Sequence, residues 1–142
     1  MLEKIRAFLL SYPGWEEGNL LFIDEADHMP GNAGLFPEGL QTVAVRQDIL
    51  GNKEVRYRLA FSLYRASAET EKDAPWLLDF QNWIAGQSAL GRIPALGDVP
   101  REESLRAEKG KLTRRQGTGG LYCVLLTAEF TKLYEVNKNG EN

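Results

Sequence analysis

KEVRYRLAFSLYRAS, residues 53–67, is the stretch that decides the fold. In it, apolar side chains stand at every second position, and charged, small or hydroxyl-bearing side chains alternate with them. The apolar series is Val55, Tyr57, Leu59, Phe61 and Leu63. Because successive side chains of a strand point to opposite faces, this period of two predicts a strand with one apolar face. That face needs a second layer of structure to cover it.

Residues 42–49 are the other arm of a predicted β-hairpin. Gly51-Asn52 lies between the two arms and predicts a two-residue type II′ turn, because glycine supplies the positive φ required at its first position. The apolar run at 20–23 predicts one more short strand. The segment 24–40 is acidic at its start and then rich in Gly, Pro and Asn. For this segment we predict a long surface loop.

The covering layer is predicted from residues 74–90, where apolar side chains recur at helical spacing. Asp73 is the expected N-cap of this helix, and Pro75 falls in its expected first turn. We expect the helix to pack on the apolar face of the hairpin. A second, short amphipathic helix is predicted at 1–11. The apolar stripe of the longer helix contains Trp76, Leu77, Phe80, Trp83 and Ile84.

Two strands, 104–113 and 121–136, complete the expected sheet. The last is apolar on both faces in its first half, which indicates a central position. We predict a flexible basic connection at 109–120 and a frayed tail at 137–142. The chain is thus expected to be a single α+β domain, 1–142, with a mostly antiparallel sheet of about four to five strands. The predicted core is Leu59, Phe61, Leu63, Phe80, Trp83, Ile84, Val124, Leu126 and Phe130.

Composition narrows the class of protein but supplies no chemistry. The chain has 142 residues, of which 43% are hydrophobic and 26% charged, close to the globular average. No apolar run reaches the roughly 18–20 residues of a membrane-spanning helix. A single cysteine excludes an internal disulfide and, with a single histidine, the usual zinc sites. A net charge of −3 argues against a protein that coats nucleic acid over its whole surface.

His28 and Cys123 are the candidates for catalysis, and neither has the neighbours it needs. His28 stands among acidic residues and could act as a general base, but no nucleophile motif accompanies it. We expect an exposed loop histidine. The acidic residues around it lack the spacing of a calcium-binding EF-hand loop. Cys123 lies in an apolar strand, and we expect a buried structural cysteine. We therefore predict no enzyme and no catalytic, cofactor-binding or metal-binding residue.

Two oppositely charged segments are candidate contact surfaces. Three interpretations stay open for the basic segment: a solvated hairpin tip, a contact with an acidic protein neighbour, or a contact with nucleic-acid phosphates. DNA contact is kept as an alternative and is not predicted. The basic segment, 109–115, contains Lys109, Lys111, Arg114 and Arg115. The acidic segment, 16–27, contains Glu16, Glu17, Asp24, Glu25 and Asp27.

Three stretches resemble the small tail-completion proteins of long-tailed bacteriophages and prophages. RYRLAFSLYRAS (56–67) is similar to their Arg-x-Tyr-x-Phe-Ala-Leu-x-Ser-Arg strand. FQNWI (80–84), followed by GRIPALG (91–97), is similar to their Phe-x-x-Trp-(Leu/Ile) and Gly-x-(Leu/Ile)-Pro-x-Leu-Gly motifs. The closing strand, ending near Phe130 and Tyr134, also fits. The resemblance covers about residues 40–135, none of its motifs is catalytic, and the segment 24–39 departs from the pattern.

The resemblance implies a minor capsid or minor tail protein of the tail-terminator class. Such a protein is a non-enzymatic subunit of a homo-oligomeric ring, hexameric by that resemblance, where the tail tube meets the head–tail connector. The resemblance also implies assembly in the host cytoplasm followed by residence in the virion tail. Each contact of a closed ring joins two different surfaces, and segments 16–27 and 109–115 are our candidates for them. The alternatives are a small enzyme using His28 with nearby carboxylates, and a nucleic-acid-binding module using 109–115.

Overall fold

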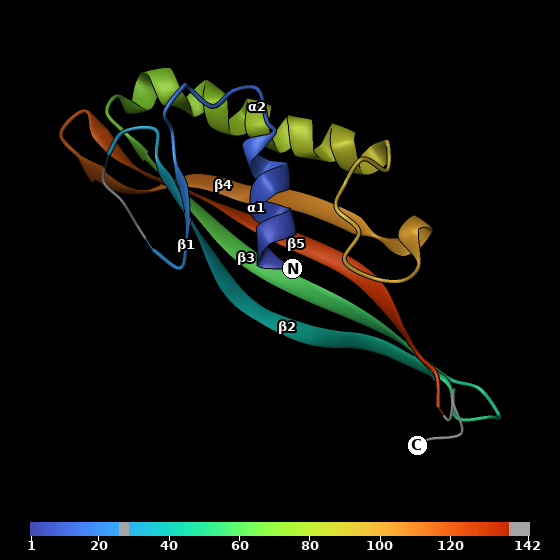
Figure 1. The fold of residues 1–142 in the computed structure, drawn as a ribbon. Coiled ribbons are helices and arrows are strands. Elements are labelled where there is room, and N and C mark those ends of the chain that lie inside the picture. The colour runs from blue at the N-terminus through green and yellow to red at the C-terminus, as the bar shows by residue number, and fades with distance from the viewer. Residues whose placement is uncertain (26–28, 137–142) are drawn as a thin grey trace.

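The computed structural model describes residues 1–25 and 29–136 and contains one sheet with helices on one of its faces (Figure 1). The expected α+β class is confirmed. In chain order the elements are α1 (Leu2–Leu10), β1 (Leu21–Ile23), β2 (Ala33–Gln47), β3 (Lys53–Ser67), α2 (Thr70–Ala89), the 3-10 turn η1 (Pro100–Glu102), β4 (Ser104–Gln116) and β5 (Gly119–Tyr134).

The five strands lie in the order β1-β2-β3-β5-β4. Among the described residues, β1 and β2 are the parallel pair, and each of the other neighbouring pairs is antiparallel. The strand predicted at 53–67 is confirmed at both ends, and it lies in the centre of the sheet beside β5. The mostly antiparallel sheet is therefore confirmed, with a short parallel strand added at one edge.

The core lies between the sheet and the two helices. Phe61 pairs with Leu126 and Leu63 with Val124, so the apolar series of β3 and β5 meet on the helix-bearing face. Eight of the nine predicted core residues are buried, and Trp83 is partly buried. The Trp83 ring stacks on Phe8 of α1, with ring centroids 5.0 Å apart, so it closes the seam between the two helices instead of facing the sheet.

The long loop predicted at 24–40 is wrong from residue 33 onward, because β2 begins there. Ala33 and Leu35 are buried, and the chain around them pairs with β1 on one side and with β3 on the other. Pro37 sits just past the last residue paired with β1, where β2 has become an edge strand and a missing N–H is tolerated. Two bulges, at Pro37/Gly39 and Thr42/Ala44, absorb the irregular sequence.

The predicted two-residue turn at Gly51-Asn52 is also wrong. Gln47 pairs with Lys53, so residues 48–52 form a five-residue loop. Asp48 organises this loop: its carboxylate accepts hydrogen bonds from the backbone N–H groups of Leu50 and Asn52, at 2.9 and 3.0 Å. Gly51 has the expected positive φ of 91°, but within this longer loop.

Helix α2 begins at Thr70, before the predicted residue 74, and Asp73 is not its N-cap. The Asp73 carboxylate instead accepts a hydrogen bond from Ser67 and lies 3.9 Å from the guanidinium of Arg65. Pro75 therefore falls inside the helix. The helix also lies over β4 and the neighbouring part of β5, not over the β2–β3 hairpin as expected (Figure 1).

The flexible connection predicted at 109–120 is mostly strand. β4 runs to Gln116 and β5 starts at Gly119, which leaves Gly117 and Thr118 as the turn. Gly117 takes the positive φ of the turn, whereas Gly110, Gly119 and Gly120 lie where an added side chain would meet neighbouring atoms. At Gly110, an added Cβ would stand 2.4 Å from the side-chain oxygen of Gln81, so the absence of a side chain lets α2 approach β4 closely. The tail predicted at 137–142 lies outside the described residues.

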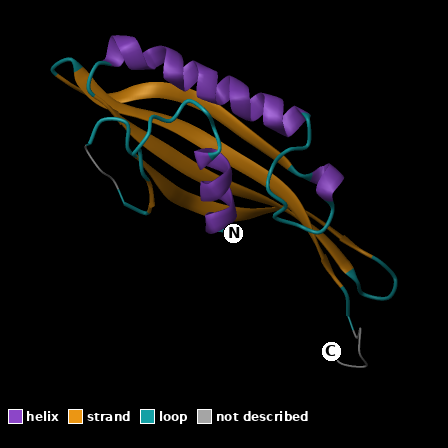
Figure 2. Ribbon diagram, turned by 45° about the horizontal axis from the view of Figure 1, so that its top comes forward, coloured by secondary structure: helices purple, strands orange, loops and turns teal. Residues whose placement is uncertain are grey.

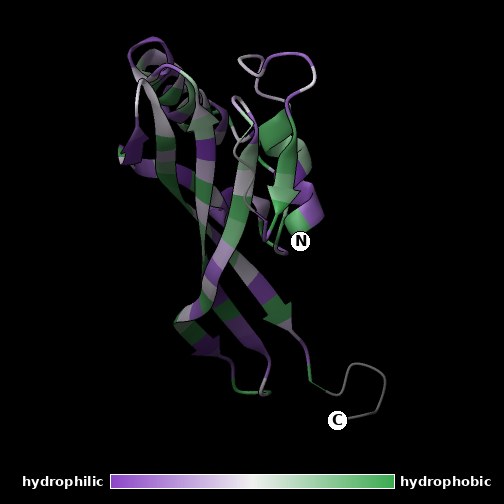
Figure 3. Cartoon of the chain, turned by 90° about the vertical axis from the view of Figure 1, so that its left-hand side faces the viewer, coloured by the Kyte–Doolittle hydropathy of each residue, from purple (hydrophilic) through white to green (hydrophobic). Residues whose placement is uncertain are grey.

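Strands β2, β3 and β5 continue beyond the helices as a projecting arm, residues 40–58 and 129–136 (Figure 2). Hydrophobic and hydrophilic bands alternate along its strands (Figure 3). Several apolar side chains of the arm are exposed because no helix covers them. The most exposed are Leu40, Val45, Ile49 and Leu50, at 55%, 55%, 99% and 75%.

Replacing Phe80 with alanine should lower the free energy of unfolding by about 3–5 kcal/mol, because a fully buried ring leaves a cavity. Leu78 on the same helix is 68% exposed, and Leu78→Ala should change the free energy by less than about 0.5 kcal/mol. Urea denaturation of both variants checks the orientation of α2. Equal losses for the two substitutions would contradict it.

Candidate functional site

Asp24 and Glu25 of the acidic segment and the basic residues of the other segment lie at opposite edges of the sheet. Asp24 directly follows β1, and its backbone N–H donates to the carbonyl oxygen of Leu35 at 2.8 Å, so the acidic end of β1 stays beside β2. The basic residues lie on β4, the strand at the other edge. The structure therefore separates Asp24 and Glu25 from the basic segment 109–115 and leaves each available to a different neighbour, whereas Trp15, next to Glu16, contacts Trp76 of α2.

The described acidic residues are exposed. Glu16 and Glu17 lie in the connection between α1 and β1, and Asp24 and Glu25 follow β1. Glu16 also contributes to the field at Arg65, together with Asp73. Asp27 and His28 lie outside the described residues, so the predicted role of Asp27 in contacts and the alternative of a His28 base both stay predictions.

The basic residues of β4 are likewise exposed, and they lie on an irregular edge. Register shifts at Glu108/Lys111 and Leu112/Arg114 break the ladder with β5, and Lys109 takes a positive φ of 57° at the first of them. Bulges and cationic side chains are two devices that keep an edge strand from uncontrolled pairing. The basic segment is thus part of a strand that pairs with β5 and projects its charged side chains outward. It is not the mobile tip that the sequence suggested.

Cys123 is half-buried on the helix-free face and is not part of the core, which corrects the expected buried cysteine. It lies opposite Tyr64 on β3. Burial raises the pKa of the Cys123 thiol, and hydrogen bonding with Tyr64 only partly offsets that rise. A thiol with a raised pKa is a poor nucleophile at neutral pH, so this cysteine does not form an activated site.

Three arginines converge on Glu129 on the helix-free face, where the arm meets the first residue of β4. The Arg56 Nε atom donates to one carboxylate oxygen at 3.1 Å, and Arg58 donates twice to the other at 3.3 Å. Arg106 of β4 completes the group at 3.9 Å. Burial raises the pKa of Glu129, but the hydrogen bonds and charges of Arg56 and Arg58 outweigh burial and leave it below the ordinary value. The group links three strands and carries an excess of positive charge.

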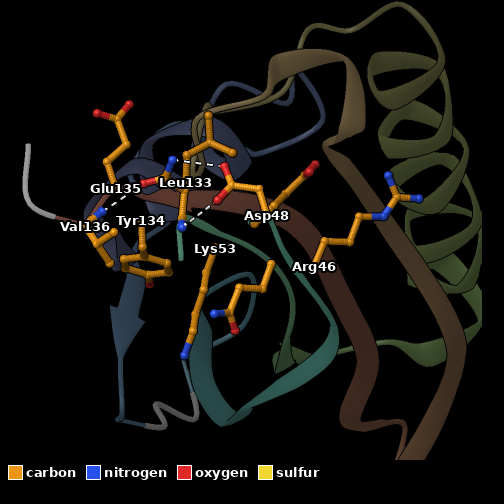
Figure 4. Close-up of a pocket in the computed structure, with 10 residues that line it drawn as sticks. Arg46, Asp48, Lys53, Leu133, Tyr134, Glu135 and Val136 are labelled. Atoms are coloured by element: carbon orange, nitrogen blue, oxygen red, sulfur yellow. Dashed lines mark hydrogen bonds between the residues drawn. The ribbon is translucent and has the colours of Figure 1, made fainter. Parts of the chain in front are cut away.

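A cavity of about 630 Å³ lies at the end of the arm (Figure 4). Its walls come from the loop after β2, the start of β3 and the end of β5. Asn52 donates to the Asp48 carboxylate at 2.9 Å and accepts from the backbone N–H of Val136 at 3.0 Å, so the loop is fastened to the segment that follows β5 (Figure 4). The hydrogen bonds lower the pKa of Asp48, that from the Asn52 side chain most. The cavity brings together no nucleophile with a base.

The described residues show neither a metal centre nor a membrane span. Within 1–25 and 29–136, no three histidine, cysteine or acidic side chains are grouped so that they could hold a metal ion. None of the described helices combines the length and the apolar content needed to cross a bilayer. The strongest geometric features are therefore the two sheet edges, the arm and the arginine group around Glu129.

The arginine group around Glu129 and the buried Arg65 were missed in the sequence. The Arg65 guanidinium lies over the Trp76 ring, with its central carbon 4.0 Å from the ring centroid. The sequence shows that Arg56 and Arg58 lie on the same face of β3. It does not show that Glu129 of β5 lies opposite them, because that depends on strand register.

Comparison with known proteins adds no family to this geometry. No protein-family model matches the chain. No curated protein matches it either.

Replacing Glu129 with glutamine should destabilise the protein by about 1–3 kcal/mol at pH 7, because the arginines lose a charged acceptor. The folded-state pKa of Glu129 is lowered, so its contribution is present above the ordinary carboxyl pKa and is lost as the pH falls through the folded value. The gap between the two proteins should therefore close below about pH 4. Thermal or urea unfolding from pH 7 to pH 3 measures this gap, and a constant gap would contradict it.

Proposed function

We propose that this chain is a non-enzymatic subunit of a ring in the tail of a long-tailed bacteriophage or prophage, as a tail terminator or head–tail connector component. The proposal rests on the resemblance of residues 40–135 and is supported by one structural observation. Exposed acidic residues at the β1 edge and exposed basic residues on β4 occupy opposite edges of one sheet. A subunit with different, complementary edges suits head-to-tail contacts, the kind of contact from which a ring is built when the rotation between subunits closes.

The absence of a converging nucleophile and base among the described residues fits this proposal better than the enzyme alternative. The alternative of a nucleic-acid-binding module has one supporting feature, the exposed cations of β4. It predicts retention on DNA that falls steeply with salt concentration.

Reversing charge at Arg114 and Arg115, to Glu at both positions, should weaken self-assembly and shift the sedimentation coefficient toward that of the monomer. The effect should be largest at low ionic strength, because exposed charges are screened over about 10 Å at 0.1 M salt. An unchanged oligomer size at several salt concentrations would count against β4 as a contact surface.

The proposed place in the tail is tested by mass measurement of the purified chain with and without tail tube protein from a phage that carries this gene. We expect the chain to bind tube ends and to stop tube extension, as seen by electron microscopy. Tubes that neither bind the chain nor change in length would overturn the proposal. A gene position far from tail and head–tail genes would argue in the same direction.

A further inference from the structure

The outer edge of strand β2 lacks a strand partner along most of its length. Within the described part of the chain, β1 pairs with residues 33–35 of β2, and no strand pairs with the outer edge from residue 36 to 47. Along this stretch Leu40 and Val45 are each 55% exposed and Val43 is 41% exposed, because α2 lies over β4 at the other side of the sheet (Figure 1). A long free edge with exposed apolar side chains is a template for a further strand.

The hydrogen bonds of the hairpin show which backbone groups of β2 face this free edge. The N–H and C=O groups of an antiparallel strand point alternately toward its neighbour and away from it. The N–H of Asp48 donates to the carbonyl oxygen of Asn52 inside the hairpin, at 3.0 Å, which fixes the phase of this alternation. Following the alternation along β3, where no extra residue interrupts it, places the backbone groups of Val45 and Leu40 on the outer side of β2. These groups are thus directed away from β3, toward the position of an added strand.

Other edges of the sheet are closed within the chain. Near the start of β4, the backbone N–H of Leu105 and the backbone oxygen of Ala107 are each bound by a side chain of α2, at 3.2 Å. The end of β5 is closed by the loop before η1, because the backbone N–H of Asp98 donates to the carbonyl oxygen of Thr131 at 2.7 Å. The rest of β4 is cationic and is interrupted by two register shifts. The strand in a second copy that best matches the free edge of β2 is therefore β2 itself.

We propose that two copies of this chain associate through β2, with residues 38–47 of each copy paired antiparallel about a two-fold axis perpendicular to the sheet. Leu40 of each copy then lies opposite Val45 of the other, and their outward backbone groups form the ladder hydrogen bonds. The Thr42/Ala44 bulge permits this register, because its extra residue brings Leu40 and Val45 to the same face of β2. The helix-bearing faces of both copies lie on one side of a continuous sheet.

Charge complementarity supports a second copy as the occupant and favours this register. Within residues 38–47 the charged side chains are Glu38 and Arg46. Both lie on the helix-free face, since Glu38 accepts a hydrogen bond from Ser62 at 2.5 Å and Arg46 pairs with Glu54 of β3. In the proposed register Glu38 of each copy comes beside Arg46 of the other. One strand thus supplies both signs, and the two-fold axis repeats the attractive contact.

This contact goes beyond the ring proposal and does not depend on it. It joins two equivalent surfaces and is complete in a dimer, whereas the contacts of a ring join two different surfaces. It also leaves the basic residues of β4 outside the contact. Strand addition of this kind gains affinity from backbone hydrogen bonds and specificity from the side chains that meet across the new pair.

The first test uses an edge variant, Leu40→Lys with Val45→Lys. It should weaken dimerisation by roughly 30-fold or more, because the two-fold axis brings four lysines together at the centre of the contact. The control is Leu78→Lys with Leu90→Lys on α2, which makes the same chemical change at positions 68% and 64% exposed and outside the contact. Sedimentation velocity at up to roughly 100 µM measures association, and circular dichroism checks that each variant is folded. Equal losses in the edge variant and the control would overturn the proposal.

The second test is specific to β2 meeting β2. Glu38→Arg and Arg46→Glu, each alone, place like charges beside one another and should weaken dimerisation by roughly tenfold at low salt. A 1:1 mixture of the two variants should recover the dimer, because each arginine of one variant then meets a glutamate of the other.

Two results would overturn the proposal. One is a mixture that associates no better than its components. The other is a wild-type chain that stays monomeric at every concentration, which would leave the edge of β2 to a strand from a different protein. A dimer that behaves as described while Arg114→Glu with Arg115→Glu has no effect and tail tubes are unaffected supports the β2 contact and counts against the ring.

Discussion

The register between β3 and β5 is the constraint on which the rest of the structure depends. Phe61 lies opposite Leu126 and Leu63 opposite Val124, so two alternating sequences present one continuous apolar face. A slip of one residue would turn every one of these side chains to the other face. That face fixes where α1 and α2 dock, and the opposite face receives the residues left over, among them Glu129. Core and charged group are thus two consequences of one alignment.

The sequence predicted those elements whose pattern is complete within the element itself, and it failed where pairing with distant strands decides the structure. The strand 53–67 was predicted to the residue because its alternation is uninterrupted, and the buried series of β5 followed from the same rule. β2 was predicted nine residues short at its start, because Gly34, Pro37 and Gly39 read as loop residues. Pairing with β1 and β3, and bulges at two places, override those local preferences. The length of the connection between β4 and β5 was overestimated for the same reason.

For the candidate contact surfaces too, the local part could be predicted from the sequence and the part set by topology could not. Which residues carry charge was plain in the sequence, but that β1 and β4 form opposite edges is a fact of topology. The prediction that α2 packs on the β2–β3 hairpin was wrong, because sequence periodicity shows that a helix has an apolar stripe and not which strands the stripe covers. Gly110 is the one sequence feature that reflects how α2 docks on β4, because a residue with a side chain would collide with Gln81 and Leu77 of the helix.

The fastening of the arm has a mechanical consequence. Asn52 ties the loop after β2 to the segment that follows β5, and the hydroxyl groups of Tyr57 and Tyr134 meet at 2.9 Å across two of the same strands. A load applied at the tip along the strands is therefore shared by many ladder hydrogen bonds at once, instead of opening them one after another. The three strands of the projection are thus tied to one another at its tip by side chains as well as along its length by their ladders.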